Sequence, residues 1–214
     1  MWPFSLPYLR KSNGRVVLSD LRDSVEREMN DLTLYKSIAP RMDTWDLLTY
    51  RTEGIIPSLI HLWSPDNHAG AVLRLPEFEG LENRRWTLEA VGSGVKLSLL
   101  SHVLERVHGE VYWHQLKPEF NDLRNLAGCW GIAQSGVVKY DFKGLFAKAV
   151  GWAVPDMAKL LCSEYYYFGA LKATMIKELE TIPSPSELPD MGITLPPVLI
   201  VESEPLPPIP VVQP

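Results

Sequence analysis

Apolar residues recur at helical spacing near the start of the chain. In the stretch SDLRDSVEREMNDLTLYKS, residues 19–37, charged side chains fill the positions between the apolar residues Leu21, Val25, Met29 and Leu32. This spacing places one apolar stripe along a helix, and Ser19 or Asp20 is a suitable N-terminal cap. The sequence therefore predicts an amphipathic helix over this range.

From residue 44 the pattern changes to short apolar segments, which are typical of strands. Strands are predicted at WDLLTYR (45–51), HAGAVLRL (68–75), RWTLEAV (85–91) and EVYWHQL (110–116). Turn-forming stretches such as SPDN and VGSGV separate them. Helices are predicted at 97–107, 117–131, 142–149 and from Met157 or Leu161 to Glu180. The mixture predicts an α+β fold.

After Glu180 the chain is dense in proline and follows neither helical nor alternating spacing. Prolines lack a backbone donor and favour extended geometry. We therefore divide the chain into an N-terminal arm with its helix (1–41), a compact domain (42–180) and a proline-rich extended tail (181–214). The tail is interpreted as disordered by itself or draped over a surface. The alternative is a docking segment for a protein partner in a larger assembly.

Length and charge narrow the classes of partner. A chain of 214 residues with 46% hydrophobic residues is long enough to bury a core. Its net charge of −5 argues against nucleic-acid partners, and no apolar run approaches the roughly 20 residues that span a bilayer. The start, MWPFSLPYLRKSNGR, does not resemble a signal peptide. Synthesis in the cytoplasm with reduced cysteines is expected, which leaves the place of action open.

Cys162 is the first candidate for chemistry, because LCSEYYYFGAL (161–171) places it at the predicted opening of a helix. Either it fills a core as a small apolar residue or it acts as a nucleophile. A thiol with a pKa near 8.5 is mostly protonated at neutral pH, and a helix N-terminus or a neighbouring imidazolium lowers that pKa. Cys129 is interpreted as structural.

Five histidines are available to activate Cys162. His68 follows a predicted turn and opens a predicted strand, so a rigid element holds it where a reacting group can approach. His114 lies in another predicted strand and is the second candidate. His61 is interpreted as packed, and His102 and His108 as solvated.

Glu89 is the candidate for orienting the imidazole. It lies between apolar neighbours in WTLEAV, and a carboxylate is costly to bury unless it is paired. If this strand forms a hairpin with HAGAVLRL, Glu89 reaches His68. The alternative is a glutamate on the exposed face of the strand.

Four segments in this order carry a resemblance to a known family. They are WDLLTYRTEGIIPSLIHLWSPDNHAGAVLRL, WTLEAVGSGVKLSLL, VVKYDFKGL and LCSEYYYFGAL. Together they resemble the circularly permuted branch of the papain-like cysteine peptidases, the NlpC and p-sixty superfamily. That branch includes the YiiX-like and the lecithin:retinol acyltransferase-like proteins. The resemblance covers residues 42–171. It implies a permuted papain-like fold over 42–180, with a small antiparallel sheet packed against helices and the nucleophile at a helix N-terminus.

The resemblance also assigns roles to single residues. It implies that Cys162 is the nucleophile, His68 the general base and Glu89 the third polar residue, without a cofactor or a metal. The substrate-binding residues that it implies are Asp46, Ser64, Tyr140 and Asp141. The chain departs from the family where Trp45 replaces the usual glycine before the aspartate, and in the spacer PDN before His68.

Three functions remain open at this point. The resemblance favours a cysteine hydrolase that cuts an amide bond through a thioester, with peptidoglycan stem peptides as substrate. A lipid-directed esterase or acyltransferase is the second function. The third is a structural component of an assembly with an idle site. The arm and the tail suggest a tether within a larger particle such as a phage virion or tail.

Overall fold

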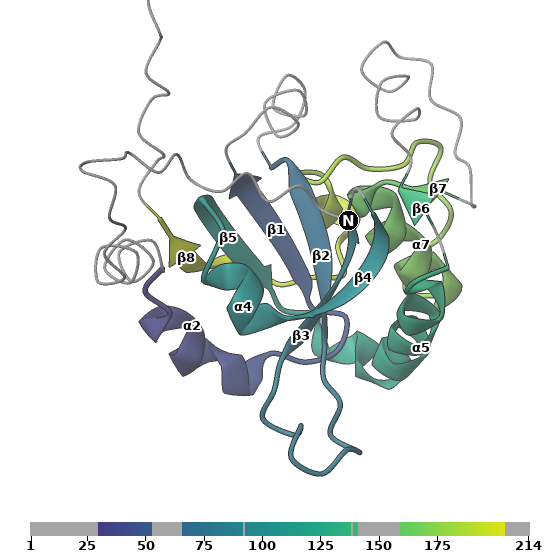
Figure 1. Ribbon diagram of the computed structural model, residues 1–214. Coiled ribbons are helices and arrows are strands. Elements are labelled where there is room, and N and C mark those ends of the chain that lie inside the picture. Colours follow the sequence, from purple (N-terminus) through teal and green to yellow (C-terminus); the bar gives the residue numbers. More distant parts are fainter. Residues whose placement is uncertain (1–29, 53–65, 92, 138, 141–158, 204–214) are drawn as a thin grey trace, which may run out of the picture.

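The computed structural model describes residues 30–52, 66–91, 93–137, 139–140 and 159–203 (Figure 1). The longer elements are α2 (Thr33–Ile38), β1 (Leu47–Thr52), β2 (His68–Leu73), β3 (Trp86–Val91), β4 (Gly94–Leu99), α4 (Leu100–Leu104), β5 (Gly109–His114), α5 (Arg124–Gln134), α7 (Cys162–Lys172) and β8 (Val198–Glu202). The shorter ones are the 3-10 helices η1 (Ala39–Arg41), η2 (Pro118–Leu123) and η3 (Leu188–Met191), and the strands β6 (Lys139–Tyr140) and β7 (Lys159–Leu160).

Six strands form one sheet in the order β4-β3-β2-β1-β5-β8, and every neighbouring pair is antiparallel. The register of β1 and β2 sets Thr49 opposite Ala69 and Tyr50 opposite His68. The hairpin of β2 and β3 sets Leu88 opposite Ala71. The predicted pairing of HAGAVLRL with WTLEAV is therefore confirmed.

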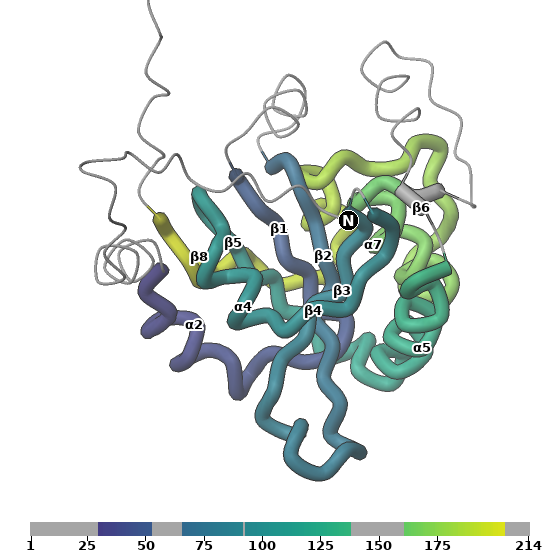
Figure 2. Tube along the Cα trace, viewed as in Figure 1, coloured from purple at the N-terminus to yellow at the C-terminus, as the bar shows by residue number. Residues whose placement is uncertain are grey.

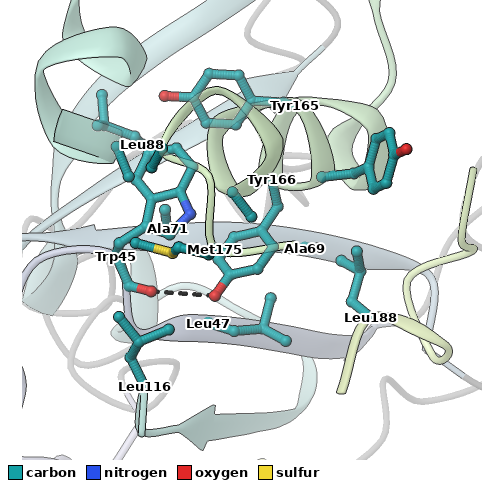
Figure 3. Close-up of a cluster of buried hydrophobic side chains, with 14 of the residues drawn as sticks. Trp45, Leu47, Ala69, Ala71, Leu88, Leu116, Tyr165, Tyr166, Met175 and Leu188 are labelled. Carbon is teal, nitrogen blue, oxygen red and sulfur yellow. Dashed lines mark hydrogen bonds between the residues drawn. The ribbon is translucent and has the colours of Figure 1, made fainter. Parts of the chain in front are cut away.

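Helices cover both faces of the sheet, with α2 and α4 on one side and α5 and α7 on the other (Figures 1 and 2). Each side has its own buried cluster. Between α7 and the sheet, Tyr165 and Tyr166 pack against Trp45, Leu88 and their neighbours (Figure 3). Buried aromatic rings remove large apolar areas from water, so this cluster fixes α7, and with it Cys162, against the sheet. No described helix is long and apolar enough to cross a membrane.

The strands predicted at WDLLTYR, HAGAVLRL, RWTLEAV and EVYWHQL are confirmed as β1, β2, β3 and β5. The helix predicted at 97–107 is wrong in its first part. Residues 94–99 form β4, which pairs along its whole length with β3, and α4 covers only five residues. Pairing with an existing strand outweighed the helical spacing of these residues, which is a tertiary effect that local sequence does not contain.

The other predicted helices are shorter than expected or lie elsewhere. The helix at the end of the domain ends at Lys172 rather than Glu180. The stretch 117–131 divides into η2 and α5, and α5 continues to Gln134. Within the predicted N-terminal helix 19–37, the described residues 30–32 are not helical, and α2 begins only at Thr33. The carboxylate of Asp31 accepts hydrogen bonds from the backbone and the hydroxyl of Thr33 there. The helix predicted at 142–149 lies outside the described residues.

Both predicted domain boundaries divide residues that share a core. From the proposed tail 181–214, β8 pairs with β5 at the edge of the sheet, and Leu188 and Ile193 join the cluster beneath α7. From the proposed arm 1–41, α2 contributes Tyr35 and Ile38 to the opposite cluster. The boundary at residue 181 was wrong because the tail contains the apolar run VLIV (198–201) after Pro196 and Pro197. This run has no proline and forms the strand β8 (Val198–Glu202).

Candidate active site

Cys162 is the first residue of α7 and is 3% exposed. Leu161, which precedes the helix, has no side-chain acceptor, and its own N–H donates to Glu164 Oε2 at 3.0 Å instead. The backbone N–H groups of Ser163 and Ala69 donate to the sulfur of Cys162. The sulfur therefore faces the positive end of the helix dipole and two direct donors, both of which favour a thiolate.

His68 stands between the thiol and a carboxylate. It is the first residue of β2, and its Nε2 lies 2.8 Å from Glu89 Oε2 on β3. It also forms a hydrogen bond with Cys162, for which Nδ1 remains. The side chain of His68 is 22% exposed. The predicted reach of Glu89 to His68 is confirmed, and the alternative of an exposed glutamate is wrong.

Two hydroxyls hold Glu89, and sequence reasoning missed both. Tyr50 on β1 donates to Glu89 Oε1 at 3.0 Å, and Thr87 donates to the same oxygen at 2.9 Å. The Tyr50 ring also lies 5.1 Å from the His68 ring between centroids. Thr87 shares a strand face with Glu89, which the alternation of side chains along a strand indicates. The contact of Tyr50 with Glu89 could not be predicted, because it depends on how β1 is aligned with β2, and no local sequence pattern specifies that alignment.

The electrostatics favour a charged pair at Cys162 and His68. Burial by itself lowers the pKa of His68, but the charge of Cys162, the hydrogen bond with it and the contact with Glu89 raise that pKa from 6.5 to about 10. Burial likewise raises the pKa of the Cys162 thiol, but the charge of His68, its hydrogen bond and the backbone donors bring the pKa below its usual value. The imidazolium and the thiolate therefore stabilise each other.

Glu89 stays ionised in this setting. Burial raises its pKa, but the hydrogen bond with His68, the charge of His68 and the hydroxyls of Thr87 and Tyr50 lower the pKa below its usual value. Burial, the charge of Glu89 and the hydrogen bond to it raise the pKa of Tyr50 well above 10, so the phenol keeps its proton and remains a donor. The carboxylate thus supports the positive charge of His68.

Gly70 leaves the space that Glu89 occupies. A Cβ at Gly70 would lie 2.8 Å from Glu89 Cγ and 3.0 Å from Thr87 Oγ1. The replacement Gly70→Ala is therefore expected to displace Glu89, to lower the free energy of unfolding by about 1–3 kcal/mol and to slow alkylation of Cys162 at pH 6. Urea denaturation and alkylation kinetics measure the two effects.

A double replacement is the control for this prediction. In Glu89→Ala the Cγ atom is absent, so adding Gly70→Ala to it should cost less stability than Gly70→Ala costs in the wild type. Equal costs in the two backgrounds would show that the clash lies elsewhere.

Asp46 does not lie where a substrate contact requires it. Its carboxylate is 0% exposed. The donors around it are Trp113 Nε1, the backbone N–H groups of Asp43 and Leu116, and Arg124 at 2.7 Å. Burial raises the pKa of Asp46, while Arg124 and the backbone donors oppose that shift. We therefore correct its role: Asp46 ties the start of β1 to β5 and α5, and its oxygens are occupied by the protein.

The remaining candidates are spread through the chain. Ser64, Asp141 and His61 lie outside the described residues. Tyr140 belongs to β6, whose backbone pairs with β7, and its side chain is outside the described part. His114 is buried in β5 with its Nε2 3.1 Å from Thr49 Oγ1. The exposed residues among the candidates are His102 and Cys129. Histidine, cysteine and acidic side chains form no group of three that could hold a metal within the described ranges.

Comparison with known proteins places the fold. No family model and no curated protein matches the chain. Among solved structures it is similar to the metalloprotein yiiX from Escherichia coli O157:H7, with a TM-score of 0.51 and 16% identity. The match covers 63% of this chain and 68% of the other. At this identity the likeness shows the fold alone, so the chain has a YiiX-like α+β fold built on an antiparallel sheet.

Proposed function

We propose that this chain is a cysteine hydrolase that cleaves an amide bond through a thioester on Cys162, in a permuted papain-like fold of the NlpC type. One observation carries the proposal: Cys162, His68 and Glu89 form a continuous hydrogen-bonded row at the N-terminus of α7. If Cys162 only filled space in the core, the costly burial of His68 and Glu89 beside it would have no purpose. Strongly shifted pKa values of this kind cluster at functional sites.

The row supports a complete reaction. The Cys162 thiolate attacks the amide carbonyl carbon, the C–S bond forms and the carbonyl oxygen takes the negative charge. The C–N bond then breaks, and the imidazolium of His68 gives its proton to the departing amine. His68 next takes a proton from water as the water oxygen attacks the thioester. Release of the Cys162 thiolate yields the carboxylic acid, and His68 keeps the proton that restores the charged pair.

The start of α7 also provides stabilisation for the oxyanion. The first four N–H groups of a helix have no acceptor inside the helix. The N–H of Cys162 belongs to this set, because Cys162 is the first residue of α7. A donor at this position favours the negative charge that develops on the carbonyl oxygen.

The name of the yiiX neighbour mentions a metal, and the described residues of this chain contain no group of three histidine, cysteine or acidic side chains that could hold one. Of the three side chains in the row, His68 is occupied by Glu89 and Cys162, and Glu89 already accepts from Tyr50, Thr87 and His68. A metal at this row would have to displace these hydrogen bonds, because each ligand must turn a deprotonated donor atom toward the ion. We therefore derive no step through a metal.

For the substrate we propose the stem peptides of peptidoglycan, as the resemblance to NlpC-type peptidases implies. We propose further that the protein reaches this substrate as a component of a virion or of another assembly. A lipid-directed acyl transfer uses the same thioester and differs in the substrate. An idle site in a structural protein would leave no thioester.

Incubation with peptidoglycan stem tetrapeptides tests the proposal. We expect new amine termini in the peptides, and a mass increase on Cys162 that corresponds to an acyl group after rapid acid quenching. Cys162→Ala should lower the rate by on the order of 1,000-fold or more. Cys129→Ala, on the exposed face of α5, should retain full activity. Turnover that persists in Cys162→Ala would refute the assignment.

A further inference from the structure

Tyr50 reaches the row of Cys162, His68 and Glu89 across an intervening strand. Its hydroxyl donates to Glu89 Oε1 on β3 at 3.0 Å, although β2 lies between β1 and β3 in the sheet. Gly70 on β2 leaves this path open, since a Cβ there would lie 2.8 Å from Glu89 Cγ. Tyr50 is 2% exposed and stands opposite His68 in the register, with 5.1 Å between the ring centroids. The tyrosine therefore adjoins both Glu89 and His68.

The two carboxylate oxygens of Glu89 have separate partners. Oε1 accepts from Tyr50 and Thr87, whereas Oε2 lies 2.8 Å from His68 Nε2. Glu89 is buried, so a carboxylate that turned would leave its oxygens without donors, which is costly away from water. Thr87 belongs to the same strand as Glu89 and moves with it. Tyr50 instead ties the carboxylate to β1, the strand that pairs with the start of β2 at His68.

Loss of the Tyr50 hydroxyl would have two opposing effects on His68. A donor on Oε1 withdraws charge from the carboxylate, so its loss by itself strengthens the attraction of Glu89 for the imidazolium. The same loss releases the carboxylate to turn, which weakens that attraction. One hydrogen bond changes the strength of its neighbour by roughly 10–30%, whereas a carboxylate that turns away removes the bond to His68 altogether. The second effect is therefore the larger one.

We propose that Tyr50 is a positioning residue of the reaction: its hydroxyl holds the Glu89 carboxylate in the orientation in which Oε2 faces His68. Tyr50 acts through Glu89 and takes no proton itself. The part of this inference that concerns turnover rests on the proposed function. The part that concerns the charge of His68 rests on the contacts alone.

The neighbouring elements carry further charged groups. Lys96 on β4 stands opposite Glu89 in the register, and Glu164 on α7 accepts from the backbone N–H that precedes the helix. From α7, Cys162 forms a hydrogen bond with His68. Every variant of the test keeps Lys96, Glu164 and Cys162, so a change in the titration of His68 reports its contact with Glu89.

Two measurements follow the state of the row. NMR of ¹⁵N-histidine-labelled protein gives the pKa of His68, and iodoacetamide labelling of Cys162 against pH gives the midpoint of thiolate formation. The variants are Tyr50→Phe and Thr87→Val, each alone and combined with Glu89→Ala.

Tyr112→Phe is the matched control. It removes a tyrosine hydroxyl that also donates to a glutamate, Glu110 Oε2 at 2.7 Å, but on β5 and outside the row. It should leave the titration of His68 and the labelling of Cys162 unchanged. Urea denaturation of every variant shows that the folded state is being compared.

Tyr50→Phe should lower the pKa of His68, raise the pKa of Cys162 and slow alkylation at pH 6 about fivefold, the effect of one hydrogen bond. In the Glu89→Ala background it should add no further change, because the carboxylate that the hydroxyl holds is gone. On the stem tetrapeptide, Tyr50→Phe should lower kcat and leave KM unchanged, as expected of a residue that acts through Glu89 rather than on the substrate.

Thr87→Val keeps the tyrosine, so it should shift the pKa of His68 less than Tyr50→Phe does. This variant also tests the proposal if Tyr50→Phe folds poorly. A shift in Thr87→Val as large as that in Glu89→Ala would mean that Tyr50 by itself does not hold the carboxylate, which overturns the proposal.

Failure of this inference and failure of the proposed function give different results. A pKa of His68 that is unchanged or raised in Tyr50→Phe, or an equal shift in the Glu89→Ala background, overturns the positioning role and leaves the pair of Cys162 and His68 standing. The expected shifts without turnover of the tetrapeptide would remove the proposed function. The hold of Tyr50 on Glu89 would then remain, and its part in the reaction would be lost.

Discussion

Replacing His68 with alanine is expected to move the pH midpoint of Cys162 alkylation upward and to slow alkylation at pH 6 by roughly 10- to 100-fold. In the wild type the charge of His68 lowers the pKa of Cys162 against the opposing effect of burial. Without the imidazolium, burial dominates, the thiol keeps its proton to higher pH and the thiolate becomes scarce below neutrality. A more basic thiolate is also more nucleophilic, so the rate falls less than the thiolate fraction does.

The protein contains two internal references for this measurement. Cys129 is exposed on α5, so the same digest follows its labelling at every pH in wild type and variant. His102→Ala removes an exposed histidine from α4 and should leave the profile of Cys162 unchanged. If His68→Ala and His102→Ala give the same profile as the wild type, the pairing of His68 with Cys162 has no chemical effect.

The pairing of His68 with Glu89 could be predicted because each is a polar residue in an otherwise apolar strand. Glu89 is a carboxylate among apolar neighbours, and His68 opens a strand that is otherwise apolar. Burial of such groups requires partners, and a short hairpin limits which partners are near. The hydrogen bond between them follows from these two facts.

The parts that could not be predicted depend on tertiary contacts. Tyr50 reaches Glu89 from β1 because of a register that nothing local specifies. Asp46 was assigned to a substrate by its place in a motif, whereas Arg124, 78 residues further along, occupies its carboxylate. The prolines on both sides of β8 concealed its strand pattern in the sequence. The strand forms because the edge of β5 offers backbone hydrogen bonds, which local spacing does not indicate.

Trp45, which departs from the pattern of the family that the sequence resembles, has an unusual backbone conformation. The sequence has tryptophan where the family that it resembles usually has glycine before the aspartate. In the structure its φ is 67°, a left-handed conformation that glycine adopts without strain. Its N–H donates to Val72 O and its carbonyl accepts from the Tyr166 hydroxyl, so both sides of the residue are held.

The indole explains why the chain tolerates this backbone. It stacks on Tyr166, with 5.5 Å between the ring centroids (Figure 3). It also lies so close to α7 that a Cβ at Gly169 would overlap it. On α5, a Cβ at Gly131 would come within 2.7 Å of the ring. The buried ring of Trp45 therefore contacts both α5 and α7 and joins them to the sheet. The packing that this ring provides offsets the cost of its backbone conformation.

Trp45→Ala is expected to lower the free energy of unfolding by about 3–5 kcal/mol, because the cavity that it leaves separates α5 and α7 from the sheet. Trp45→Gly loses the same ring but removes the left-handed strain, which costs a residue with a Cβ about 1–2 kcal/mol. Glycine is normally less stable than alanine by about 0.5–1 kcal/mol in regular structure. Here the order should reverse, with Trp45→Gly about 0.5–1 kcal/mol more stable than Trp45→Ala.

Urea denaturation of the two variants measures this difference, and equal slopes against urea concentration would show that their unfolded states are comparable. Because both variants lack the indole, the cavity contributes equally and the difference reports the backbone alone. The usual order, with alanine the more stable, would mean that the conformation at residue 45 costs less than the roughly 0.5–1 kcal/mol that glycine loses through its greater chain entropy. The tryptophan would then be held there by packing only.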